Sequence, residues 1–208
     1  MIKLGILGGS FNPVHKGHIE LANYLVDKHI VDEVVMIPSV KNPLKGMEDY
    51  VDTLHRYLML KEGINEIGRK PNVYASPIEM QQFSGRDSVY AVELLKHIVY
   101  KNVDEYDNIE FYYIIGADTF NKLHLFKDYE WITESGIIKT IVMMRPGSNL
   151  SNENVNTDNC IFVPDCPQID ISSTVVRSLI KEGKLHIAAE YVPDSVLHYI
   201  TQKHLYGF

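Results

Sequence analysis

Two histidines three residues apart, His15 and His18, could act together on one ligand. On a helix, side chains at this spacing lie on one face and point at the same group. They come shortly after a glycine pair, Gly8 and Gly9. A glycine turn between a strand and a helix aims unpaired backbone N–H groups and the positive end of the helix dipole at an anion. The pattern therefore predicts a phosphate-binding turn with two imidazoles at its mouth.

A strand and a helix are expected on either side of this turn. Residues 2–7 form a mostly apolar run that is typical of a buried parallel strand. After the histidines, apolar residues recur at helical spacing at Ile19, Ala22, Leu25 and Val26. A glycine pair alone would fit an ordinary tight turn about as well, so the prediction depends on the whole segment.

A second cluster of phosphate-type side chains comes far downstream. Ser172, Ser173 and Thr174 stand where a helix is expected to begin, and Arg177 lies one turn further on. Simple N-capping by serine or threonine is the alternative interpretation. The two uses are compatible, because a helix start needs capping and also favours anions. The planar guanidinium of Arg177 suits phosphate oxygens.

These two segments resemble the signatures of a known family of nucleotidyltransferases. Residues 8–18, GGSFNPVHKGH, are similar to the motif G-x-F-x-P-x-H-x-G-H in the form found in nicotinate or nicotinamide mononucleotide adenylyltransferases. Residues 171–177, ISSTVVR, match the family motif I-S-S/A-T-x-x-R. The resemblance covers essentially the whole chain. It implies a Rossmann-like α/β fold and adenylyl transfer from ATP to a pyridine mononucleotide in NAD biosynthesis.

The resemblance also implies roles for individual residues. Among the catalytic residues, His18 is expected at the α-phosphate and the transition-state charge, His15 on the triphosphate, and Arg177 on the β- and γ-phosphates. The remaining contacts to ATP and its phosphates are expected from Gly8, Gly9, Ser10, Phe11, Lys45, Gly116, Asp118, Arg145, Ser172, Ser173 and Thr174.

Three of these assignments depend on shorter matches. Residues 115–118 resemble the family's I-G-A-D loop, in which the carboxylate, here Asp118, accepts from ribose hydroxyls. An aspartate N-cap for the next helix is a nearly equal alternative. Arg145 opens an R-P-G segment that lies near adenine in the family. Lys45 stands where the family often has P-P-H-K, but the sequence here is N-P-L-K, so the histidine is missing.

The mononucleotide is expected beside Tyr90 and Phe126. Members of the family selective for nicotinate often carry S-Y-T and T-W at these places, where this chain has V-Y-A and L-F. Phe126 keeps an aromatic ring to stack on a pyridine, whereas Ala91 lacks the hydroxyl. The choice between acid and amide stays open on these residues. We expect a preference for nicotinate mononucleotide, with backbone N–H groups receiving its carboxylate, and measurable use of the amide.

The implied reaction needs positioning more than activation. An attacking phosphate is already anionic at neutral pH, so neither a general base nor a covalent intermediate is required. We expect Mg²⁺ to arrive with ATP, because a cation must offset the charge being transferred. No protein metal site is expected.

The remaining elements fit a doubly wound, mostly parallel sheet with helices on both faces. Strands are expected at residues 33–38, 72–76, 110–116, 139–144 and 160–163, with helices between them and at about 173–182 and 194–203. A further helix is expected after residue 50, with an apolar face at Val51, Leu54, Tyr57, Leu58 and Ile64. Such sheets bind ligands at the carboxyl ends of their strands, where the strand order reverses.

Composition narrows the class of protein. The 208 residues are most simply one nucleotidyltransferase domain, residues 1–208, and a net charge of −7 does not favour nucleic acid as a partner. No apolar run approaches the roughly 20 residues that a membrane helix needs, and no cleavable leader is expected. Cys160 and Cys166 are expected as free thiols in a reducing cytoplasm. The expected partners are ATP and the mononucleotide, and a homo-oligomer is left open.

Two other classes of function remain as alternatives. One is another small-molecule adenylyl- or cytidylyltransferase of the same superfamily, although the R-T-x-S-T-T motif common in those relatives is absent. The other is a nucleotide-binding regulator without catalysis. The presence of His15, His18 and Arg177 together argues against a regulator.

Overall fold

One parallel sheet organises the molecule. The computed structural model describes residues 1–40, 50–86, 88–103, 108–144, 150, 155–164, 166–167 and 171–208. Within these ranges, six strands pair in the order β3-β2-β1-β4-β5-β6, every neighbouring pair being parallel. Their bounds are β1 Ile2–Gly9, β2 Glu33–Pro38, β3 Val73–Ala75, β4 Ile109–Gly116, β5 Ile138–Met143 and β6 Cys160–Val163. The predicted fold class is confirmed.

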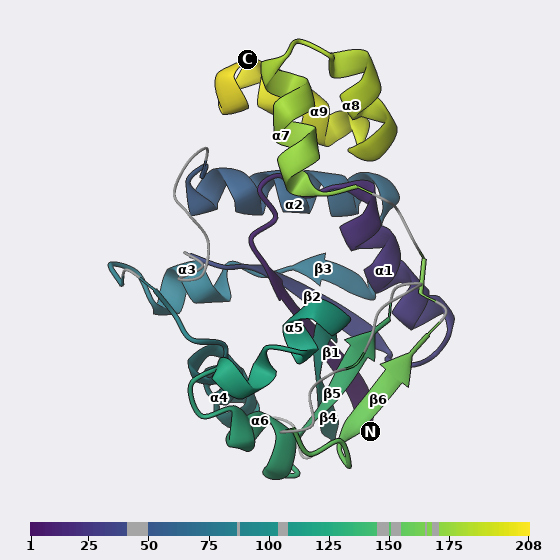
Figure 1. Ribbon diagram of the computed structural model, residues 1–208, viewed down its shortest axis with the longest axis vertical. Helices are drawn as coiled ribbons and strands as arrows, with labels where there is room; N and C mark the ends of the chain where they lie inside the picture. The colour runs from purple at the N-terminus through teal and green to yellow at the C-terminus, as the bar shows by residue number, and fades with distance from the viewer. Residues whose placement is uncertain are drawn as a thin grey trace.

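Helices cover both faces of the sheet (Figure 1). In the described ranges they are α1 Lys16–Asp27, α2 Thr53–Ile67, α3 Ile78–Gln82, α4 Ala91–Val103, α5 Ala117–Phe120, α6 Tyr129–Glu134, α7 Ser173–Lys181, α8 Leu185–Tyr191 and α9 Asp194–Gln202. Two 3₁₀ turns, Leu123–Leu125 and Leu205–Gly207, follow α5 and α9. Helix α8 was not expected.

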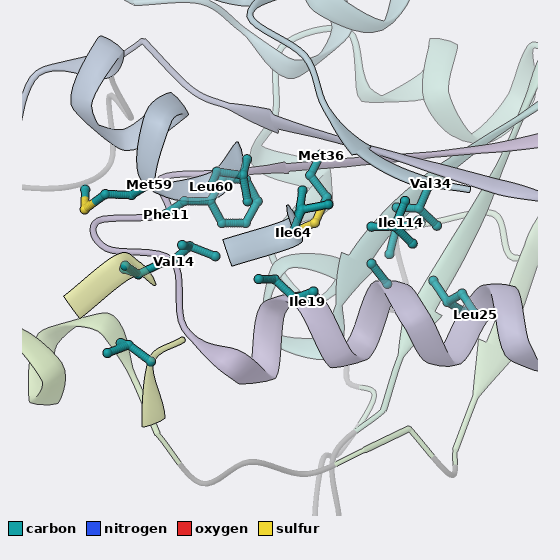
Figure 2. Close-up of a cluster of buried hydrophobic side chains, with 14 of the residues drawn as sticks. Phe11, Val14, Ile19, Leu25, Val34, Met36, Met59, Leu60, Ile64 and Ile114 are labelled. Carbon is teal, nitrogen blue, oxygen red and sulfur yellow. The ribbon is translucent and has the colours of Figure 1, made fainter. Parts of the chain in front are cut away.

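Alternation along the strands divides the core in two. In β4, Tyr112 and Ile114 pack on the side of α1 and α2, whereas Phe111, Tyr113 and Ile115 pack on the side of α4 and α6. This two-residue period is what a strand buried on both faces requires. Figure 2 shows the first cluster, with the apolar face of α1 turned toward the sheet. Of the four apolar positions predicted for α1, Ile19, Ala22 and Leu25 are buried and Val26 is half-buried.

The face predicted for α2 is partly wrong. Leu54 is 49% exposed, whereas Arg56 is fully buried. The buried face of the helix consists of Thr53, Arg56, Met59, Leu60, Gly63 and Ile64. Gly63 allows this register, because a Cβ there would lie only 3.0–3.3 Å from Ile19, Val196 and Pro193.

The C-terminal helices α7, α8 and α9 gather beyond α2, at the top of Figure 1. Two polar tethers hold them to the first half of the chain. The carboxylate of Glu66 accepts hydrogen bonds from the backbone N–H groups of Asp194 and Ser195 (3.0 and 2.7 Å), at the start of α9. The ammonium of Lys16 donates to the carbonyls of Ala189 and Glu190 (3.0 and 3.1 Å), at the end of α8. This packing brings the start of α7 to the turn after β1.

Two composition-based expectations can be compared with the structure. Cys160 and Cys166 are free thiols, half-buried and buried respectively. Across the described ranges, no helix combines the length and the apolar character that crossing a membrane would require.

Candidate active site

A cleft of about 640 Å³ opens at the carboxyl ends of β1 and β4. The strand order reverses between these two strands, since β1 runs toward β2 and β3 on one side and β4 toward β5 and β6 on the other. Such switch points are where doubly wound sheets bind ligands. Among the predicted site residues, the cleft is lined by Gly8, Gly9, Ser10, Phe11, His15, His18, Gly116, Ser172, Ser173, Thr174 and Arg177.

The two glycines at the end of β1 have different reasons to be glycine. A Cβ on Gly8 would meet no atom within 4 Å, so it would project into the open cleft. A Cβ on Gly9 would lie 2.9 Å from the ring of Phe11. Phe11 itself has φ +44°, a left-handed conformation that non-glycine residues adopt rarely. Its ring is 2% exposed and belongs to the core below α2, so burial of the ring holds the turn in this conformation.

The first turn of α1 fixes the two histidines. His15 is the N-cap of α1, and its backbone N–H donates to Nδ1 of His18 (3.2 Å). The two imidazole rings stack with centroids 3.6 Å apart, and the ring of Phe11 meets that of His18 edge-on at 5.1 Å. Because Nδ1 accepts this bond, neutral His18 carries its proton on Nε2. His18 is half-buried at the cleft and is therefore an oriented donor.

The start of α7 is bonded to the turn after β1. Ser172 is the N-cap, and its Oγ accepts from the N–H of Val175 (3.3 Å). Ser173 Oγ donates to the carbonyl of Pro13 (2.8 Å), and Arg177 Nη1 donates to the carbonyl of Asn12 (2.8 Å). The two sequence motifs, more than 150 residues apart, thus form one wall of one cleft. Ser172 does cap the helix, as the alternative interpretation had it, and it also faces the cleft.

Some predicted residues are not brought into this wall. Asp118 is exposed in the first turn of α5 and is not its N-cap, a position that Gly116 occupies. Tyr90 is 42% exposed beside the start of α4, and Phe126 packs against the α4 side of the core. None of these three lines the cleft in this conformation, so their roles in binding stay predictions. Lys45 and Arg145 lie outside the described residues.

A cation beside Tyr90 was not found from the sequence. Lys127 Nζ lies 4.8 Å from the centroid of the Tyr90 ring, and it pairs with Glu93 Oε1 at 3.4 Å. Arg86 pairs with the other oxygen of the same carboxylate at 2.9 Å. The single carboxylate of Glu93 therefore holds two cations at this edge of the molecule. Lys127 directly follows Phe126, and that adjacency was the available signal.

Arg56 is the second residue that sequence reasoning missed. Its guanidinium is fully buried and donates to the carbonyls of Ser10 (2.7 Å), Val40 (3.0 Å) and Val51 (2.8 Å). Burial lowers the pKa of Arg56 below its usual value. A buried cation is tolerated only when its donors are satisfied, and here backbone carbonyls satisfy them. The sequence could have indicated this burial, because helical spacing places Arg56 on the same face as Thr53, Leu60 and Ile64 and not on the face of Leu54.

Glu79 lies next to this cation. Its Oε1 accepts from the N–H of Val40 (2.7 Å), and the side chain is 4% exposed. Burial raises the pKa of Glu79 to about 7, although the bond from Val40 and the charge of Arg56 both oppose that rise. The carboxyl is therefore poised to change its charge near neutral pH.

The cleft offers donors and cations for an anionic ligand. Nε2 of His18, the guanidinium of Arg177 and the start of α7 all present positive charge or N–H groups to it. Among the described residues, no three His, Cys, Asp or Glu side chains are grouped so as to hold a metal ion. Such an arrangement suits the binding and stabilisation of phosphates better than nucleophilic catalysis.

Comparisons with known proteins agree with this chemistry. The family model described as cytidylyltransferase-like matches residues 6–179. The nicotinate-nucleotide adenylyltransferase of Bacillus subtilis is 32% identical over 207 residues, covering 99% of both chains. The chain therefore belongs to the cytidylyltransferase-like family, in its nicotinate-nucleotide adenylyltransferase branch.

Solved structures show the same fold. The nicotinic acid mononucleotide adenylyltransferase of Plasmodium falciparum, complexed with APC, superposes with a TM-score of 0.80 over 100% of this chain and 98% of that one. The same enzyme complexed with NaAD gives 0.81 with the same coverage. Both are 19% identical in sequence, so they support the architecture rather than individual site residues.

Proposed function

We propose that this protein transfers the adenylyl group of ATP to nicotinate mononucleotide, giving the dinucleotide and pyrophosphate. The observation that carries the proposal is the joining of the two motifs in one cleft, where Arg177 and Ser173 bond to the turn that ends in the histidine pair. The relative from Bacillus subtilis is named for this activity, and the similarity covers 99% of its length.

The reaction is an in-line displacement at phosphorus. An oxygen of the mononucleotide phosphate forms a bond to the α-phosphorus of ATP, and the bond from that phosphorus to the β-phosphate oxygen breaks. Pyrophosphate leaves with the electron pair. Nε2–H of His18 donates to the α-phosphate oxygens, whose charge is exposed in the transition state. Arg177 and the start of α7 hold the β- and γ-phosphates, which become the leaving group.

Magnesium belongs to the substrate in this proposal. Mg²⁺ usually keeps several waters and is bound by substrate phosphates with one or two carboxylates. No cluster of metal-binding side chains occurs among the described residues. In this proposal the triphosphate oxygens and water therefore supply the ligands of Mg²⁺. Pyrophosphate release should accordingly depend on Mg²⁺ and should stop when a chelator removes it.

The preference for the acid is the finer part of the proposal. Nicotinate mononucleotide carries a carboxylate where the amide is neutral, and a nearby cation would favour the acid. The ammonium of Lys127 lies beside Tyr90 and one residue after Phe126, the two residues expected to contact the pyridine. We infer that Lys127 adds to the backbone N–H groups as a source of this selectivity.

The test measures pyrophosphate release with ATP and each mononucleotide under identical magnesium. We expect a higher kcat/KM for the acid, measurable turnover of the amide, and no turnover when CTP replaces ATP. Lys127→Met should narrow the ratio between acid and amide, while Lys101→Met, a matched surface change at the far end of α4, should not. A higher kcat/KM for the amide in the wild-type protein would overturn the preference.

The cellular site completes the proposal. Both cysteines are free thiols, as expected in a reducing compartment. We therefore propose that the enzyme works in the cytoplasm.

A further inference from the structure

Tyr206 reaches the turn after β1 from the opposite end of the sequence. It lies in the 3₁₀ turn Leu205–Gly207 that follows α9, and its hydroxyl donates to Oδ1 of Asn12 at 2.9 Å. Both side chains are buried, Tyr206 at 7% and Asn12 at 3% exposure. Tyr206 has φ +62°, in the left-handed region that non-glycine residues adopt rarely. The surrounding packing therefore holds the backbone in a costly conformation that delivers this hydroxyl.

Asn12 also bonds to two further parts of the molecule. Its Oδ1 also accepts from the backbone N–H of Val51 (3.2 Å), just before α2. Its main-chain carbonyl accepts from Nη1 of Arg177 (2.8 Å), on α7. Asn12 therefore links Tyr206 to Arg177: its side chain accepts from the tyrosine hydroxyl, and its main-chain carbonyl accepts from the guanidinium, which also bonds to Thr174.

A tyrosine at this place needs a reason that packing does not supply. A phenylalanine would fill the same apolar space, whereas a buried hydroxyl costs free energy unless it is hydrogen-bonded. The bond to Asn12 satisfies it in a buried setting, where hydrogen bonds are electrostatically stronger than in water. The hydroxyl contacts Asn12, the residue of the turn whose main-chain carbonyl accepts from Arg177.

We propose that Tyr206 is a positioning residue for ATP, acting through Asn12 on Arg177. This inference rests on the proposed function for its substrate, and on the contacts above for its mechanism. Tyr206 does not line the cleft, so it acts without touching the nucleotide. A residue that only stabilised the fold would lower the melting temperature without changing the affinity for one substrate in particular.

The test compares two matched substitutions in the C-terminal part of the chain. Tyr206→Phe removes the hydroxyl that holds Asn12. Tyr199→Phe removes a hydroxyl of the same kind on α9, which is hydrogen-bonded to Nδ1 of His55 (2.9 Å) and not to the turn. Both variants are assayed at least 15 °C below their measured melting temperatures, about four or more times the shift that 1 kcal/mol produces in a chain of this length.

The expected result is a change specific to ATP. Tyr206→Phe should raise the KM for ATP about 5- to 20-fold, the range of a lost hydrogen bond transmitted to a charged contact, and change the mononucleotide KM less than about twofold. Tyr199→Phe should leave both constants within about twofold. The proposal is overturned if Tyr206→Phe only lowers the melting temperature, or if it raises both KM values equally.

A double-substitution cycle tests the route through Arg177. If Tyr206 acts through this arginine, Tyr206→Phe should raise the KM for ATP by a smaller factor in an Arg177→Lys background than in the wild type. If the factors by which the two single substitutions raise the KM for ATP multiply fully in the double variant, Tyr206 does not act through Arg177. Direct calorimetric binding of a non-hydrolysable ATP analogue separates this inference from the proposed function. A wild-type protein that binds the analogue but makes no dinucleotide refutes the function, while the binding comparison still decides the role of Tyr206.

Discussion

The backbone N–H of His15 donates to Nδ1 of His18, so one histidine of the pair sets the tautomer of the other. In a neutral histidine, the hydrogen bond made by one ring nitrogen decides which nitrogen carries the proton and can donate to a phosphate. Here the helix N-cap residue supplies that direction through its main chain, independent of its own side chain. The side chain of His15 also lines the cleft.

His18→Ala should lower kcat by about 10²-fold or more, the scale of losing one preorganised donor to the transition state. The KM for the mononucleotide should change less than kcat, because the donor acts mainly in the transition state. Steady-state pyrophosphate release measures both constants. A circular dichroism spectrum and melting curve like those of the wild type are the control. An unchanged kcat would remove His18 from the mechanism.

Arg177→Lys should weaken the binding of ATP although the positive charge is kept. The guanidinium bonds to Asn12 and Thr174 with two different nitrogens, and a lysine ammonium cannot reproduce this fork. We expect the KM for ATP to rise about tenfold, the effect of losing one charged hydrogen bond, with kcat falling as well. The matched control is Lys181→Arg at the end of the same helix. Wild-type ATP kinetics in Arg177→Lys would indicate a structural arginine.

Gly8→Ala should leave stability unchanged and impair catalysis. A Cβ at this position meets open space in the protein itself and can only crowd a ligand in the cleft. We expect kcat/KM for ATP to fall roughly tenfold or more through displacement of the nucleotide. Gly9→Ala is the contrasting variant, because its Cβ would lie 2.9 Å from the Phe11 ring; it should lose about 1–3 kcal/mol of unfolding free energy. Unimpaired kinetics in Gly8→Ala would mean that the nucleotide does not approach this strand end.

Stability should fall as pH rises from 5 to 8 because of Glu79. Its pKa is raised from 4.5 to about 7 by burial, so the folded protein binds this proton more tightly than the unfolded chain. The contribution to stability is complete below pH 4.5 and is lost as the pH rises through 7. The difference amounts to about 3 kcal/mol at most, at 1.36 kcal/mol per unit of pKa.

Urea unfolding of the wild type and Glu79→Gln at several pH values measures this effect. The glutamine keeps an oxygen for the N–H of Val40 and has no charge to bury, so its stability should depend less on pH. If the unfolding free energy of the two proteins changes equally with pH, the titrating group is not Glu79.

Much of the sheet could be predicted because each strand is coded locally. The apolar runs at residues 2–7, 33–38, 110–116 and 139–144 each became a strand within two residues of the expected bounds. Short elements were less accessible. Helix α8 buries Ala188 as its main anchor, and one small residue gives almost no periodic signal.

The side chains that support the site were harder to predict than those that line it. His15, His18 and Arg177 carry motifs, so their convergence on one cleft was expected. Arg56 lies on a helix face where a charge contradicts the usual pattern, and its burial is explained by backbone carbonyls of three separate segments together with the hydroxyl of Thr53. The bond between Tyr206 and Asn12 spans 194 residues, and no local pattern in either segment indicates the other.

The long span of these contacts also determines when activity can first appear during synthesis. The turn after β1 is made among the first residues, yet its carbonyls and the side chain of Asn12 are held by Ser173, Arg177 and Tyr206. A nascent chain that has formed only the sheet holds the histidine pair without the arginine opposite it. Closing a loop of this length is a late event in folding. Incomplete chains should therefore neither bind ATP firmly nor release pyrophosphate, and a stalled ribosome would carry an inert fragment.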